Sequence, residues 1–227
     1  LVMEGLYIND KPYIYGCQNA QFVKCWFDKG TGFSNSSSYG GAAFNYLFLH
    51  CVFNDGVSAN ATDASGTFNN CLFKTNKETL YLSYAQVMNS TFDCEIINSY
   101  PGNNSFTNCI IQQNSNFSYS SSFDRSSTVV YCTFIGKYPT KYLQYHQSAT
   151  NTIFPEGTQV FKEGTFYELL DNLKTTWLGN DGTQRGMYGS NWPFDPTTTN
   201  PRITKFNVAK KTTADGKLPV EIEVEAN

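Results

Sequence analysis

Carboxylates and tyrosines recur together between residues 55 and 100 of this chain. The residues that could contact a ligand there are Asp55, Asp63, Glu78, Tyr81, Asp93, Glu95 and Tyr100. A tyrosine ring can cover the apolar face of a sugar while a neighbouring carboxylate accepts hydrogen bonds from its hydroxyls. The pattern therefore indicates carbohydrate binding, and a solvated face of charged turns is the simpler interpretation of the same residues.

A hexapeptide repeat must position these side chains. Its clearest copies read Phe-x-x-Cys-x-Phe and span Phe22–Phe27, Phe48–Phe53 and Phe68–Phe73. The variant copies are Met3–Ile8, Val87–Phe92, Phe106–Ile111, Val129–Phe134 and Ala149–Phe154. The eight copies end at residues 8, 27, 53, 73, 92, 111, 134 and 154, so most steps are 19 or 20 residues. A β-type motif at this period is typical of a solenoid whose coils each add one strand to a stack.

Most of the cysteines share one slot of this repeat. The slot holds Cys25, Cys51, Cys71, Cys109 and Cys132, with Ser90 and Thr152 in other coils, whereas Cys17 and Cys94 lie elsewhere. Neighbouring coils are about 4.8 Å apart, which exceeds the Cβ–Cβ distance of about 3.8 Å in a disulfide. We therefore predict an inward ladder of free thiols used as small apolar groups, with no metal site.

The residue between the Cys and Phe slots should face outward in each coil. It is Tyr7, Trp26, Val52 and Leu72 in the first four coils, and Thr91, Ile110, Thr133 and Ile153 in the others. A contiguous apolar stripe of this length needs a cover. We predict that the C-terminal tail of the chain or a partner covers it.

Two Ser-rich segments, 30–41 and 115–125, account for the longer steps of the repeat. Both follow their coil by a similar offset and should project from one side of the solenoid. Together they would wall a shallow groove whose floor is formed by the third to fifth coils, where the candidate carbohydrate-binding residues lie.

After residue 154 the hexapeptide stops. Apolar residues at helical spacing predict a short helix over 166–173. Two alternating segments, 203–208 and 218–224, flank the turn residues 213–216 and predict a β-hairpin. The expected organisation is a parallel β-helix over residues 1–190, followed by a linker and a C-terminal hairpin extension over 191–227.

A glycine-rich motif closes the repeat region. It reads Asp181-Gly182-Thr183, two residues, Gly186, one residue, Tyr188-Gly189. This motif and the repeat resemble right-handed parallel β-helix proteins of the pectate-lyase-like superfamily, many of them secreted or surface-bound in bacteria. The resemblance implies an all-β, single-stranded right-handed parallel β-helix in a secreted or cell-surface protein. Arg185 departs from the aliphatic residue expected in this motif.

The resemblance also implies polysaccharide chemistry, whose site requirements are demanding. A hydrolase needs two or three carboxylates grouped across coils, and a lyase needs carboxylates that hold calcium together with a basic residue. The sequence contains no Asp-Asp pair and no Asn-Thr-Asp motif. The Asp-rich turns at residues 54–56 and 180–182 could bind calcium, but neither has the spacing of a known calcium-binding loop, so we expect no cofactor. His50 precedes Cys51 in a position where other coils carry asparagine, and we interpret it as a turn residue.

Composition narrows the functional classes. The net charge is −3, charged residues make up 15% of the chain, and no basic stripe is present, so nucleic-acid binding is not expected. No apolar run reaches the roughly 20 residues that a membrane-spanning helix needs. The chain opens inside a repeat, which suggests a mature or truncated product. The leading hypothesis is an extracellular non-catalytic module that binds polysaccharide or serves as a surface scaffold or adhesin; the alternative is a polysaccharide lyase or glycoside hydrolase.

Overall fold

The computed structural model describes most of the chain in two compact units, Leu1–Asp195 and Pro196–Asn227. The described residues are 1–15, 19–34, 44–55, 57–59, 64–75, 80–82, 84–94, 97–99, 103–113, 127–136, 148–197, 202–208, 213, 215 and 220–225. The sequence placed the boundary after residue 190.

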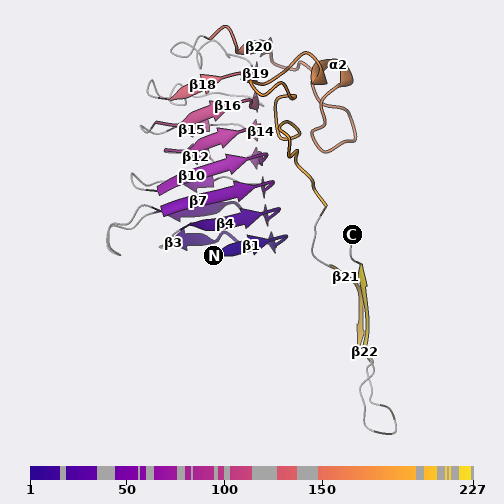
Figure 1. The fold of residues 1–227 in the computed structure, drawn as a ribbon. Coiled ribbons are helices and arrows are strands. Elements are labelled where there is room, and N and C mark those ends of the chain that lie inside the picture. Colours follow the sequence, from indigo (N-terminus) through magenta and orange to yellow (C-terminus); the bar gives the residue numbers. More distant parts are fainter. Residues whose placement is uncertain are drawn as a thin grey trace. The chain divides into compact units, whose positions relative to one another are not determined.

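The first unit is a parallel β-solenoid of three sheets (Figure 1). Its seven-stranded sheet contains β1 (Val2–Glu4), β4 (Ala20–Val23), β7 (Phe44–Leu49), β10 (Ala64–Asn69), β13 (Gln86–Met88), β16 (Ser105–Thr107) and β18 (Thr128–Val130). The eight-stranded sheet contains β2 (Tyr7–Ile8), β5 (Trp26–Phe27), β8 (Val52–Phe53), β11 (Leu72–Thr75), β14 (Thr91–Cys94), β17 (Ile110–Gln113), β19 (Thr133–Gly136) and β20 (Thr152–Pro155). The five-stranded sheet contains β3 (Tyr13–Tyr15), β6 (Thr31–Ser34), β9 (Val57–Ala59), β12 (Leu80–Leu82) and β15 (Ile97–Ser99). The predicted all-β solenoid is confirmed.

Strand register places the repeat slots directly above one another. Phe73 pairs with Phe53 on one side and with Phe92 on the other. The ring centroids of these pairs are 5.1 and 4.5 Å apart, and the rings are nearly parallel. Because identical slots recur at the inter-strand spacing, equivalent phenylalanines stack into continuous columns.

The cysteine ladder is confirmed as a row of buried free thiols. It contains Cys25, Cys51, Cys71, Cys109 and Cys132. The Cys51 thiol donates to the carbonyl of Phe22, at 3.3 Å. Burial raises the pKa values of Cys51 and Cys109, so these thiols stay protonated. Cys94 is also buried and free, and Cys17 lies outside the described residues.

The last coil is shifted by one residue relative to the predicted repeat. Phe134 pairs with Ile153, and Ile135 pairs with Phe154, so the expected alignment of Phe154 with Phe134 is wrong. At the shifted coil the Asn151 side chain accepts from the Cys132 backbone N–H and donates to the carbonyl of Val129 in the preceding coil. Phe154 instead contacts the Trp177 ring, with centroids 4.8 Å apart.

Between the seven- and eight-stranded sheets, one left-handed residue turns each coil from the second to the seventh, in the position that Gly5 holds in the first. These residues, which we call the corner row, are Lys24, His50, Asn70, Asn89, Asn108 and Tyr131, with φ between 45° and 57°. Asparagine tolerates this conformation better than most side chains. The prediction that His50 is a turn residue is confirmed.

The predicted helix over 166–173 is largely wrong. The only helix in the described part of the chain is α2, the four residues Asp171–Lys174. Phe166 packs with Val52 and Met187, whereas Leu169 packs with Ile110 and Val160. The two side chains thus enter separate apolar clusters; between them Tyr167 has a left-handed backbone, and Leu169 forms an antiparallel bridge with Phe161.

The second unit contains an antiparallel hairpin, as predicted. Its strands are β21 (Arg202–Val208) and β22 (Val220–Glu225), with a register irregularity between Ile203 and Lys205. Among the described residues of both units, no helix has the length and apolar character needed to cross a membrane.

Candidate functional site

The outer face of the eight-stranded sheet is covered by residues 156–195, which we call the closing segment (Figure 1, orange). Val52 and Leu72 are buried with Met187 and Phe194. Farther along the stack, Ile110 packs with Trp177. For this part of the outward stripe the predicted cover therefore comes from the same chain, in a segment that precedes the hairpin, whereas Tyr7 at the start of the stripe and Ile153 at its end are exposed.

Polar contacts from the corner row hold this segment. Asn70 donates two hydrogen bonds of 2.8 Å, one to the carbonyl of Met187 and one to that of Gly189. Asn108 exchanges side-chain and backbone hydrogen bonds with Asn180. The repeat predicts a turn position for these asparagines, and tertiary contacts show a second role as anchors of the closing segment.

Two further corner residues hold the end of the closing segment. The Lys24 ammonium lies 2.7 Å from a carboxylate oxygen of Asp195. His50 Nε2 lies 3.1 Å from the carbonyl of Trp192. The closing segment thus descends the corner row, from Asn180 at the sixth coil to Asp195 at the second.

The glycines of the closing motif permit this close approach. A Cβ on Gly186 would lie 2.7 Å from the Cδ1 of Ile110, and a Cβ on Gly189 would lie 2.0 Å from the carbonyl oxygen of Gln184. Asp181 accepts from the backbone N–H and hydroxyl of Thr183, which makes the predicted turn. The interpretation of Gly186 and Gly189 as close-approach residues is confirmed.

Arg185 is a buried clamp between the closing segment and the last coils. Its guanidinium donates to the carbonyls of Leu178, Cys132 and Thr150 and to the hydroxyls of Thr133 and Thr152, over distances of 2.9–3.1 Å. All five acceptors are neutral, and burial lowers the pKa of Arg185 from its usual value. The planar fork donates to five acceptors at once, which an aliphatic residue in this position could not do.

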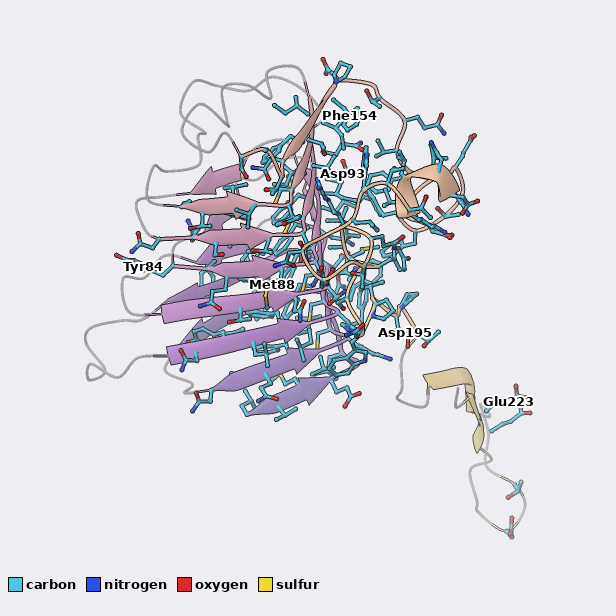
Figure 2. All side chains as sticks on the ribbon, turned by 45° about the horizontal axis from the view of Figure 1, so that its top comes forward. Tyr84, Met88, Asp93, Phe154, Asp195 and Glu223 are labelled. Carbon is cyan, nitrogen blue, oxygen red and sulfur yellow. The ribbon has the colours of Figure 1, made fainter. Side chains whose placement is uncertain are left out.

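The predicted carbohydrate-binding residues lie on different surfaces. Asp93 is in β14 of the eight-stranded sheet and accepts a hydrogen bond from the Tyr167 hydroxyl of the closing segment. Burial, and then this hydrogen bond, raise the pKa of Tyr167. Tyr81 is in β12 of the five-stranded sheet, and the half-buried Asp55 follows β8. Figure 2 shows Asp93 near the closing segment and Tyr84, just past β12, on the other side of the solenoid.

The remaining predicted site residues, Asp63, Glu78, Glu95 and Tyr100, lie outside the described residues. Most of the two segments predicted to wall the groove also lies outside the described residues. Only the start of the first segment, residues 30–34, is described, and it contains strand β6. The groove itself therefore stays a prediction.

Other carboxylates of the closing segment form a partly exposed ion-pair cluster. Lys162 lies 2.8 Å from Asp171 and 3.4 Å from Glu168, and Lys174 contacts both acids. The hydrogen bond from Lys174 is the main cause of the lowered pKa of Glu168. Such exposed pairs contribute little stability each, typically about 0–1 kcal/mol. Among the residues described, no group of three or more His, Cys, Asp or Glu side chains could hold a metal ion.

His50 has one satisfied and one unsatisfied ring nitrogen. It is buried, its imidazole ring contacts the rings of Trp192 and Phe194, and its Nδ1 has no hydrogen-bond partner in the described structure. Desolvation is the largest effect on its pKa and lowers it; Lys24 lowers it further, while the Trp192 carbonyl and Asp195 oppose the shift. Neutral His50 is therefore the form that holds the closing segment.

We expect the stability of the protein to fall as the pH drops below about 6.5, the pKa of an unfolded histidine. Because the folded-state pKa is lower, the unfolded chain binds a proton first, and the loss continues until the pH reaches the folded-state value. The slope contributed by His50 is at most about 1.4 kcal/mol per pH unit. Urea unfolding of the wild type and of His50→Asn across this range measures it, since asparagine already fills the same slot at Asn70 and Asn108. Identical pH profiles for the two proteins would contradict a buried neutral His50.

Comparisons with known proteins find no matching family model, no matching curated protein and no matching solved structure. The fold and the closing segment by themselves define the chain as a parallel β-solenoid whose outer apolar face is largely covered by residues 156–195 of the same chain.

Proposed function

We propose that this chain is a non-catalytic β-solenoid module of a secreted or surface-bound bacterial protein, a rigid scaffold that binds polysaccharide. The observation that carries the proposal is that two carboxylates beside the covered face, Asp93 and Asp195, form bonds between the closing segment and the coils. Asp93 accepts from Tyr167, and Asp195 pairs with Lys24, so both hold the closing segment onto the coils.

Glycosidase chemistry makes a different demand on carboxylates. It requires two of them within roughly 5–10 Å of each other, both open to the sugar. At Asp93 the closing segment lies against the strand, and the Tyr167 hydroxyl donates a hydrogen bond to the carboxylate that a sugar would otherwise contact. This arrangement favours a scaffold over an enzyme with Asp93 in its active site.

Native affinity electrophoresis tests the proposal. The intact protein is run through gels containing polygalacturonate, xylan, mixed-linkage β-glucan or dextran, with and without calcium. We expect retardation in at least one gel and no release of reducing ends or unsaturated uronates from the same polymer. A protein that is retarded in none of the gels would overturn the polysaccharide-binding function.

The lyase or hydrolase alternative makes the opposite prediction for the same polymers. Cleavage that is lost in both Asp93→Asn and Glu95→Gln, with unchanged melting temperatures, would establish an enzyme and refute the scaffold. Tyr167→Phe is the matched control, because it removes the hydroxyl that occupies Asp93 and leaves the carboxylate in place.

A further inference from the structure

Aromatic side chains continue the outer face of the eight-stranded sheet toward its first strand. Tyr7 and Trp26 pair in register on β2 and β5, with ring centroids 6.3 Å apart and an interplanar angle of 31°. Trp26 also contacts Phe166 of the closing segment, with ring centroids 5.8 Å apart. Tyr7 is 64% exposed, whereas Val52, two strands farther along the same row, is 2% exposed.

Hydrogen-bonding groups border these rings. Asp28 directly follows β5, and its carboxylate accepts from the Asn54 side-chain amide at 3.1 Å. The same carboxylate lies beside the Tyr7 hydroxyl; desolvation and then this hydrogen bond raise the pKa of Tyr7. Asp28 and Asn54 are both only partly buried, so each keeps some surface in contact with solvent.

We propose that Tyr7 and Trp26 form a stacking platform for a polysaccharide chain, with Asp28 and Asn54 accepting and donating hydrogen bonds at its edge. The proposal rests on the polysaccharide-binding function above and moves the contact surface away from the residues that the sequence favoured. A sugar ring presents apolar C–H groups on its face and hydroxyls around its rim, so it requires an aromatic face bordered by polar groups. The platform contains an aromatic pair and, within one strand of it, a carboxylate and an amide.

A matched pair of tyrosines in the first coil tests the platform. Tyr7 and Tyr13 are 64% and 61% exposed, but Tyr13 is in β3 of the five-stranded sheet. We expect Tyr7→Ala to weaken binding to the polymer that retards the wild type by about tenfold or more, as for truncation of an aromatic anchor. Tyr7→Phe keeps the stacking face and should keep most of the affinity, and Tyr13→Ala should bind like the wild type.

The outcomes separate this inference from the proposed function. If the wild type binds a polymer and Tyr7→Ala binds it equally well, the platform is refuted while polysaccharide binding stands. The same holds if Tyr13→Ala, rather than Tyr7→Ala, loses affinity, since the ligand would then lie on the five-stranded sheet. If the wild type binds none of the four polymers, both proposals fall. Melting temperatures of the three variants show whether each is folded.

Discussion

Phe73→Ala is expected to lower the free energy of unfolding by about 3–5 kcal/mol, the range for a fully buried phenylalanine truncated to alanine. Phe73 is 1% exposed and stacks between Phe53 and Phe92. It also packs edge-to-face with Phe68, with ring centroids 5.3 Å apart. Its removal leaves a cavity in the middle of one column, and each coil relies on its neighbours to bury its own slot. Urea unfolding followed by circular dichroism measures the loss.

Cys71→Ser is the matched substitution in the neighbouring slot. The Cys71 thiol lies 3.5 Å from the carbonyl of Phe48, so a serine hydroxyl has an acceptor within the ladder. Ser90 already fills the equivalent slot one coil later, where its hydroxyl donates to the carbonyl of Met88. We expect a clearly smaller loss than for Phe73→Ala. Equal losses for the two variants would contradict the view that the aromatic columns, rather than the thiols, supply most of the packing energy.

The second large effect is expected at Arg185. Replacement by methionine keeps an apolar stem but removes five hydrogen bonds and leaves the carbonyls of Thr150 and Leu178 without this donor, whereas the Cys132 carbonyl still accepts from the Thr152 amide. Each buried acceptor left unsatisfied costs about 1–3 kcal/mol, and release of the buried cation offsets part of the sum. We expect a net loss of roughly 2–4 kcal/mol.

The loss at Arg185 should begin in the closing segment. The amide of Arg185 donates to the carbonyl of Trp177, and the amide of Gly186 donates to that of Asn108, so both should exchange faster with solvent in Arg185→Met. Arg185→Lys retains the charge with fewer donors and should fall between the wild type and the methionine variant. If Arg185→Met is as stable as the wild type and its amides are equally protected, the guanidinium does not act as a clamp.

The closing segment changes the meaning of the outward stripe. As a sequence pattern, the stripe calls for a cover without identifying it. In the folded chain, Met187, Phe194 and Trp177 supply apolar contact, and the corner row supplies the hydrogen bonds that fix the register of the cover. The cover ends where Phe166 contacts Trp26, and beyond that contact the Tyr7 ring is exposed beside polar neighbours.

The repeat alone determined the coils, the inward columns and the free-thiol ladder, because a period of about 20 residues with a fixed slot order leaves one way to stack parallel strands. It did not predict the slip at Asn151, because that residue satisfies backbone groups of the preceding coil, an interaction that the apolar pattern does not encode. It also predicted a helix where Phe166 and Leu169 enter two different clusters.

Candidate site residues were harder to predict than the coils. The sequence predicts Asp93 as a solvent-facing carboxylate. Its structural role comes only from the tertiary contact with Tyr167, 74 residues away. Arg185 departs from an aliphatic position of the motif, but four of its five acceptors come from two distant segments of the chain, residues 132–133 and 150–152. Slot periodicity thus determines what lies inside this solenoid. What lies outside depends on a non-repetitive segment whose path is set by packing and hydrogen bonds between residues far apart in the sequence.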